Sequence, residues 1–175
     1  AGSDQFPDFC IVQPSFNTTT VNYPSGQAAV PSDRGGLALN PNNGNAVFTA
    51  ALTFDAQGNL WFTDSGNNRV LRFAASDLAR GGFLPIPNLE IGQLDFSSKQ
   101  PALPLNGTGR LTLNQLATPN AIAFDALGRL YIADADSGSP ESLSRVLVFA
   151  PPFTTGMSAA RLMGIPPQAA TGAPP

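Results

Sequence analysis

The 175-residue sequence predicts an all-β protein that consists of two four-stranded antiparallel units and one extra amino-terminal strand. Two observations support this fold class. The segment ALTFDAQGNLWFTD at 51–64 returns as AIAFDALGRLYIAD at 121–134, and RVLRFA at 69–74 returns as RVLVFA at 145–150. Each copy also contains four short strand-like runs separated by turn residues. A duplicated unit of this kind indicates stacked repeats, each of which buries its apolar face against a neighbour.

The first two runs of each copy are expected to form a tight antiparallel hairpin. The first run occupies 51–55 or 121–125 and ends in an Asp-Ala-x-Gly turn. Asp hydrogen-bonds to its own backbone in such turns, and Gly tolerates a positive φ. The second run follows the turn, at 60–64 or 130–134, so the two runs pair directly.

The third and fourth runs complete each unit. The third run lies at 70–74 or 146–150, and in the second copy it follows an inserted loop at 135–144. The fourth run lies at 88–92 or 160–164, after a loop rich in Gly and Pro. Four short antiparallel strands followed by a long crossover are typical of one blade of a β-propeller.

Further matches between the copies set the limits of the units. The segment IVQPSF near the amino terminus matches IGQLDF, which lies between the two hairpins. The chain therefore divides into an amino-terminal segment at 1–10, a first blade at 11–90, a second blade at 91–164 and a Pro-rich tail at 165–175. The extra strand is expected at 9–13, where it has no strand of its own copy to pair with.

The blade motifs resemble those of a known family. PNAIAFDALGRLYIAD at 119–134 and DSGNNRVLRF at 64–73 are similar to NHL repeats, the blades of NHL β-propellers, as found in secreted bacterial or archaeal proteins. The resemblance covers about Phe9 to Gly164. It implies a fold more firmly than a function, because the family includes scaffolds, RNA binders and lyases. Its amidating lyases rely on a metal site with histidines, and this chain contains no His.

The number of blades bears on function, because two blades cannot close a ring. The chain is expected either to be a fragment of a longer propeller or to assemble with copies of itself. Such assembly gives a ring, or a filament if the contact does not close. In it, the amino-terminal strand completes a blade of a neighbouring copy. The residues expected to carry this strand complementation are Phe9, Ile11 and Val12 on one copy, and Val146, Val148 and Leu162 on the other.

Composition and charge narrow the function classes. A net charge of −3 argues against binding of nucleic acid, which needs a concentrated positive face. No apolar run is long enough to span a membrane. The absence of His excludes Ser-His-Asp and Cys-His catalytic sets as well as His-ligated metals. We therefore expect no catalytic residue and no cofactor, and we interpret the chain as a structural or binding module rather than an enzyme.

Carboxylates in the second copy are the candidates for a metal site. Asp134, Asp136 and Glu141 are oxygen ligands of the kind that calcium prefers, although their spacing does not match an EF-hand loop. This reading belongs to the alternative function, a fragment of a calcium-dependent lyase or hydrolase whose catalytic residues lie on other blades. The structural interpretation is that Asp134, and Asp64 in the first copy, each pair with the Arg that opens the third run.

The glycosylation triplets and the low Lys content favour an extracellular or cell-surface setting. The single cysteine, Cys10, cannot form an internal disulfide and is interpreted as a small buried hydrophobe, the alternatives being an intermolecular bridge or lipid attachment. Asn17 and Asn106 each begin an N-glycosylation triplet in an expected loop. The chain also has one Lys, at position 99, and charged residues make up only 12% of it.

The aromatic residues of the second run are interpreted as packing between blades. Trp61 and Tyr131 occupy equivalent positions in the two copies. Strand alternation places Leu60 and Phe62 on one face of the first hairpin and Trp61 on the other. The alternative is that Trp61 forms a platform for a sugar.

Overall fold

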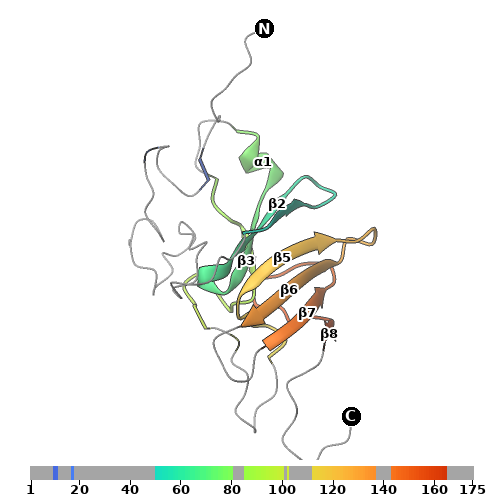
Figure 1. The fold of residues 1–175 in the computed structure, drawn as a ribbon. Helices are drawn as coiled ribbons and strands as arrows, with labels where there is room; N and C mark the ends of the chain where they lie inside the picture. Colours follow the sequence, from blue (N-terminus) through green and yellow to red (C-terminus); the bar gives the residue numbers. More distant parts are fainter. Residues whose placement is uncertain are drawn as a thin grey trace, which may run out of the picture.

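The computed structural model describes residues 10, 11, 17, 50–80, 85–100, 102, 112–136 and 143–164. These residues form two four-stranded antiparallel sheets, with the strand orders β1-β2-β3-β4 and β5-β6-β7-β8 (Figure 1). The first sheet comprises β1 (Leu52–Phe54), β2 (Leu60–Asp64), β3 (Arg69–Phe73) and β4 (Leu89–Ile91). The second sheet comprises β5 (Pro119–Phe124), β6 (Leu130–Asp136), β7 (Leu143–Phe149) and β8 (Arg161–Met163). The predicted all-β class and the two antiparallel four-stranded units are therefore confirmed.

The predicted hairpin turn is present in both copies. In the first, a carboxylate oxygen of Asp55 accepts hydrogen bonds from the backbone N–H groups of Gln57 and Asn59, each at 3.0 Å. Gly58 closes the turn at φ +78°, a conformation that a side chain disfavours. Asp125 organises the second turn in the same way. The turn chemistry thus fixes the register of both hairpins.

The inserted segment of the second copy differs from its prediction as a loop over 135–144. Strand β6 continues to Asp136 and β7 begins at Leu143, so the insertion lengthens the hairpin by two residue pairs. The first copy instead turns through the short 3-10 helix η2 (Ser65–Asn67). The loop prediction was wrong at both ends, because additional ladder hydrogen bonds extend the pairing beyond the repeated motif.

The extra strand predicted at 9–13 is not seen at its two described residues. Cys10 and Ile11 carry no strand pairing, and Cys10 is partly buried and free. Ile11 packs against a buried cluster on the first sheet of its own chain. Phe9 and Val12 lie outside the described residues, as does the tail at 165–175. The buried cluster consists of Leu60, Leu71 and Phe73.

The two sheets pack face to face around one main hydrophobic core. Strand alternation gives each sheet two faces, and we call the faces that meet the inner faces. The inner face of the first sheet consists of Trp61, Val70, Leu89 and Ile91, and that of the second of Leu130, Ile132, Leu147 and Phe149. The main core also includes Leu116 and Ala159, which lie outside the strands.

The inner faces are not equivalent in sequence. Leu130 and Phe149 of the second sheet correspond to Leu60 and Phe73, which lie on the outer face of the first sheet. Trp61 on the inner face of the first sheet corresponds to Tyr131, which lies on the outer face of the second. The sheets therefore stack head to tail, with unlike faces in contact.

One short helix, α1 (Ala75–Leu78), follows β3 and packs Leu78 against the outer face of the first sheet. Within the described residues, no helix is long and apolar enough to cross a membrane.

Candidate functional site

The contact between the two inner faces, which we call the internal joint, centres on Trp61. This side chain is completely buried. Its ring meets those of Phe124 and Phe153 edge to face, with centroid separations of 5.4 and 5.0 Å. Aromatic pairs favour this geometry because the positive ring edge meets the negative ring face. The interpretation of Trp61 as packing between the units is confirmed.

Polar contacts fix the position of the joint along the strands. The hydroxyl of Ser65 donates a hydrogen bond to the carbonyl of Pro119, and the side-chain amide of Asn68 donates one to the carbonyl of Ala117. Asn68 adopts a left-handed backbone conformation, with φ 58°. These contacts come from the η2 turn, which the second sheet replaces with a longer hairpin.

Each turn carboxylate also hydrogen-bonds the aromatic side chain at the second position of the return strand. Asp55 accepts a hydrogen bond from the indole N–H of Trp61 at 2.8 Å, and Asp125 accepts one from the hydroxyl of Tyr131 at 3.1 Å. Burial acts to raise the pKa of Asp55, but the hydrogen bonds from Trp61, Asn59 and Gln57 outweigh it and lower the pKa. The six-residue spacing from Asp to aromatic is the same in both copies and is the sequence signal for this contact.

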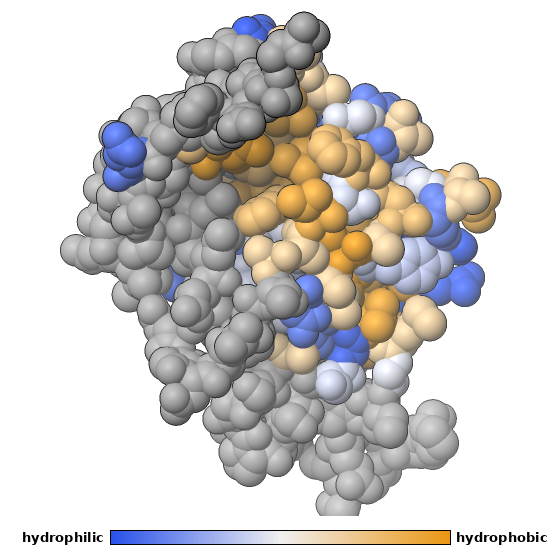
Figure 2. Space-filling view, turned by 45° about the horizontal axis from the view of Figure 1, so that its top comes forward, coloured by the Kyte–Doolittle hydropathy of each residue, from blue (hydrophilic) through white to orange (hydrophobic). Residues whose placement is uncertain are grey.

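The outer face of the second sheet carries several exposed or half-buried apolar residues. Ala121 and Ala123 of β5 are exposed, Tyr131 of β6 is half-buried, and Met163 of β8 is 52% exposed. Figure 2 shows hydrophobic residues gathered over one side of the molecule, with hydrophilic residues to their right and below them. In sequence, the outer face of the second sheet corresponds to the inner face of the first sheet.

A hollow of about 500 Å³ lies on this outer face around Tyr131. The guanidinium of Arg129 lies 5.9 Å from the centre of the Tyr131 ring, a cation–π distance, and also bonds Asp125 at 2.6 Å. The hydrogen bond that Arg129 donates to Asp125 raises the pKa of the guanidinium, which stays cationic. The hollow is lined by Arg129, Tyr131, Val148, Arg161, Leu162 and Met163.

The outer face of the first sheet is covered at its centre and exposed along β1. Leu71 and Phe73 are completely buried, and Leu78 and Phe96 pack against them. Leu52 and Phe54 of β1, by contrast, are 60% and 57% exposed. They correspond to Ile122 and Phe124, both of which pack into the main core.

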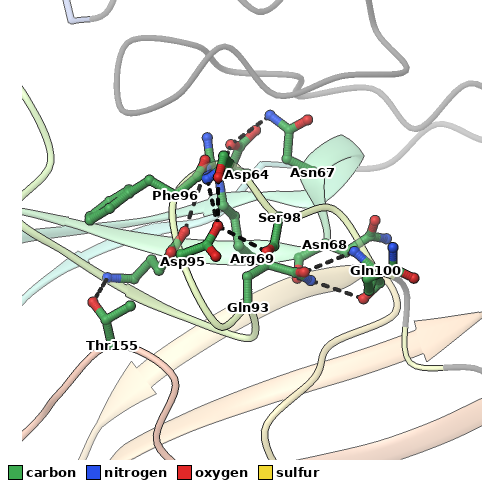
Figure 3. Close-up of polar contacts among 12 residues, drawn as sticks. Asp64, Asn67, Asn68, Arg69, Gln93, Asp95, Phe96, Ser98, Gln100 and Thr155 are labelled. Carbon is green, nitrogen blue, oxygen red and sulfur yellow. Dashed lines mark hydrogen bonds and ion pairs between the residues drawn. The ribbon is translucent and has the colours of Figure 1, made fainter.

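The first sheet also carries a buried ionic cluster, in which Arg69 bonds two carboxylates (Figure 3). Its Nε contacts Asp64 at 2.8 Å, while Nη1 contacts Glu90 at 3.3 Å and donates to the carbonyl of Phe96 at 2.8 Å. Burial raises the pKa of Glu90 to about 7 despite the charge of Arg69. Within the described residues, Oε1 of Glu90 has no hydrogen-bond partner.

The second sheet has the matching pair without the additional acid. Asp134 bonds Arg145 at 3.0 Å, and its other oxygen accepts the backbone N–H groups of Ala117 and Thr118. Leu162 stands where the first sheet has Glu90. The structural interpretation of the two Asp-Arg pairs is thus confirmed.

The calcium candidates do not form a site within the described residues. Both carboxylate oxygens of Asp134 are engaged by protein groups. The side chain of Asp136 and all of Glu141 lie outside the described residues. Across the described ranges, no group of three or more His, Cys, Asp or Glu side chains is placed to hold a metal ion.

The candidate assembly residues are divided between two locations. Val146 and Val148 lie on the outer face of β7, an interior strand that pairs with β6 on one side and β8 on the other, so β7 has no open edge for strand complementation. Leu162 packs instead against the main core, and Ile11 packs against its own first sheet. Of the glycosylation candidates, Asn17 is exposed in a turn, and Asn106 lies outside the described residues.

Neither a scan against protein-family models nor a search of curated proteins gives a match to this chain. The resemblance to NHL repeats therefore stays a prediction from the motifs.

Proposed function

We propose that this chain is a non-enzymatic assembly module whose two sheets are NHL-type propeller blades. It associates with further copies of itself by a head-to-tail contact between the outer faces of its two sheets. Stacking of whole sheets replaces strand complementation as the mechanism, because Ile11 packs against its own first sheet. No catalytic group, metal or other cofactor has a part in this function.

The observation that carries the proposal is the head-to-tail order of the two sheets. In the internal joint, the Trp61 face of one sheet covers the Leu130 face of the other. One sheet is therefore left with a Tyr131 face, and the other with a face that carries Leu60 and Phe62. These two leftover faces are the sequence counterparts of the two that already fit together.

Packing physics favours covering both faces of each sheet. A sheet with apolar residues on both sides normally lies between two other layers. The second sheet has a layer on its Leu130 side, while its other side keeps Met163 half exposed and a hollow beside Tyr131. Covering that side removes apolar surface from water at about 25 cal/mol per Å².

The geometry of a head-to-tail contact determines the two possible products. Because unlike faces meet, each added copy presents the same open face again. A rotation that closes gives a ring of defined mass, and one that does not close gives a filament. Both are structural or scaffold assemblies, and we propose that they form outside the cell or at its surface.

The extracellular setting is supported by Asn17, which is exposed in a turn and begins the triplet Asn-Thr-Thr. Expression through a eukaryotic secretory pathway followed by enzymatic deglycosylation tests whether this triplet accepts a glycan. We expect the wild type to lose more mass on deglycosylation than an Asn17→Gln variant, in which Asn106 begins the remaining triplet. An unchanged mass would remove this support.

The native mass of the purified chain, measured by sedimentation and light scattering over a wide concentration range, tests the proposed function. We expect a discrete oligomer or filaments. Met163→Asp puts a charge on the outer face of the second sheet and should shift the distribution towards the single chain. Leu127→Asp is the matched control, because Leu127 is 72% exposed at the tip of the β5-β6 turn. A wild-type chain that stays monomeric at every concentration contradicts the proposal.

A further inference from the structure

The proposed function leaves open which residues of the first sheet enter the joint between copies. We infer that the exposed strip on β1, Leu52 and Phe54, docks on Ala121, Ala123 and Tyr131 of a second copy of this chain. The inference rests on the proposed function, but it commits to one contact and one occupant.

The first-sheet side of the contact is the exposed edge of a face whose centre is already filled. Leu71 and Phe73 are covered by Leu78 and Phe96, so that part of the face is not available. Leu52 and Phe54 are each more than half exposed, although both project from a regular strand. A joint between copies must therefore use the strip along β1.

The internal joint shows what this strip does when it is covered. The equivalent strand of the second sheet is β5. It lies against β1 and β2 of the first sheet, and these are the most extensive strand contacts between the two sheets. Phe124, the counterpart of Phe54, places its ring edge to face against Trp61. Ile122, the counterpart of Leu52, packs into the same core.

The second-sheet side offers the matching surface. Tyr131 is the sequence counterpart of Trp61, which lies at the centre of the internal joint. Ala121 and Ala123 of β5 lie beside Tyr131. Both alanines are exposed, while the hollow of about 500 Å³ lies on the other side of Tyr131, towards β7 and β8. Small side chains next to an aromatic ring leave room for Phe54 and Leu52 to enter. A second copy supplies both groups at the spacing that the internal joint already uses.

Two complementary variants test this contact. Phe54→Asp spoils the first-sheet strip and keeps the second-sheet face intact. Ala123→Asp does the reverse. Both sites are exposed, so the charges are tolerated in the single chain. The fluorescence of Trp61, the single Trp of the chain, reports whether the internal joint is preserved.

Each variant alone should lose self-association by about 30-fold or more, as expected when a central aromatic contact of an interface is lost. An equal mixture of the two should form a dimer. The Ala123→Asp chain keeps an intact strip on β1, and the Phe54→Asp chain keeps an intact outer face on its second sheet. That dimer should not grow, since its free strip carries the Phe54→Asp substitution and its free face carries Ala123→Asp. Leu94→Asp, at a position 63% exposed outside both surfaces, should assemble like the wild type.

The outcomes separate this inference from the proposed function. If the wild type remains a single chain, both fail. If the wild type assembles and either variant assembles equally well, the contact inferred here is wrong while assembly stands. If both variants are single chains and their mixture does not pair, the contact is not head to tail, and the inference is again wrong.

Discussion

The two sheets share one sequence plan but differ in what covers them. The aromatic residue of the return strand is buried at Trp61 and half exposed at Tyr131. The buried Asp-Arg pair is joined by the acid Glu90 in the first sheet, where the second sheet has Leu162. The two copies therefore differ at positions whose surroundings are not the same in the two sheets. The comparison can be tested by making the same change in both sheets.

The largest expected effect comes from removing the guanidinium in the ionic clusters. Arg69→Met leaves Asp64 and Glu90 without the cation between them and should cost about 5 kcal/mol of unfolding free energy, the upper end for broken buried pairs. Arg145→Met should cost about 3 kcal/mol, because Asp134 keeps two backbone N–H donors. Denaturant unfolding of both variants measures the difference. Equal losses would show that Glu90 does not contribute to the first cluster.

The next largest loss of stability is expected at the equivalent aromatic positions, Trp61 and Tyr131. Trp61→Ala opens a cavity in the main core and should cost about 3–5 kcal/mol. Tyr131→Ala should cost about 1 kcal/mol in the single chain, the size of one hydrogen bond. Unfolding at low protein concentration, where copies are separate, measures both. Losses of equal size would contradict the difference in burial.

The pH dependence of stability isolates Glu90. Its pKa is raised from 4.5 to about 7 in the folded chain, so between these values the folded chain keeps a proton that the unfolded chain releases. This contribution to stability is fully present below about pH 4.5 and is lost as the pH rises through about 7, by on the order of 3 kcal/mol.

Glu90→Gln cannot ionise and should remove that slope. The variant should gain on the wild type steadily from pH 4.5 to above pH 7, as followed by chemical unfolding at each pH. Changes at other carboxylates cancel in the difference between the two proteins. A difference that does not vary with pH would mean that Glu90 titrates normally.

The smallest effect is expected at the turn carboxylates. Asp55→Ala strands the indole N–H of Trp61, which is buried, and should cost about 2 kcal/mol. Asp125→Ala should cost about 1 kcal/mol, because the hydroxyl of Tyr131 can turn towards water. Thermal unfolding of the two variants compares them. A larger loss at Asp125 would contradict the finding that Trp61 is buried while Tyr131 is only half-buried.

Local features could be predicted from the sequence because their causes are local. The Asp-Ala-x-Gly turns, the alternation around Trp61 and the pairing of Asp64 with Arg69 depend on residues within one hairpin. The strand ends were less accurate, since additional pairs such as Asp136 with Leu143 extend the ladder without any motif.

Features that depend on long-range packing could not be predicted. Leu162 was expected at a contact between copies, but it pairs with Leu147 on the inner face of the second sheet and packs into the core. Glu90 lies between apolar residues of β4, and its ion pair with Arg69 forms only when the folded sheet brings the two residues together. Which faces of the two sheets meet depends on the stacking of the units, and that information is absent from either repeat alone.

The hydrogen bond from the hydroxyl of Tyr131 to Asp125 has an entropic consequence. The bond and the guanidinium of Arg129 beside the ring hold the side chain in one orientation before anything contacts it. Immobilising a free side chain on association costs about 0.5–1.5 kcal/mol, and a ring that is already fixed avoids most of that cost. The carboxylate that shapes the turn therefore also prepares the ring for binding.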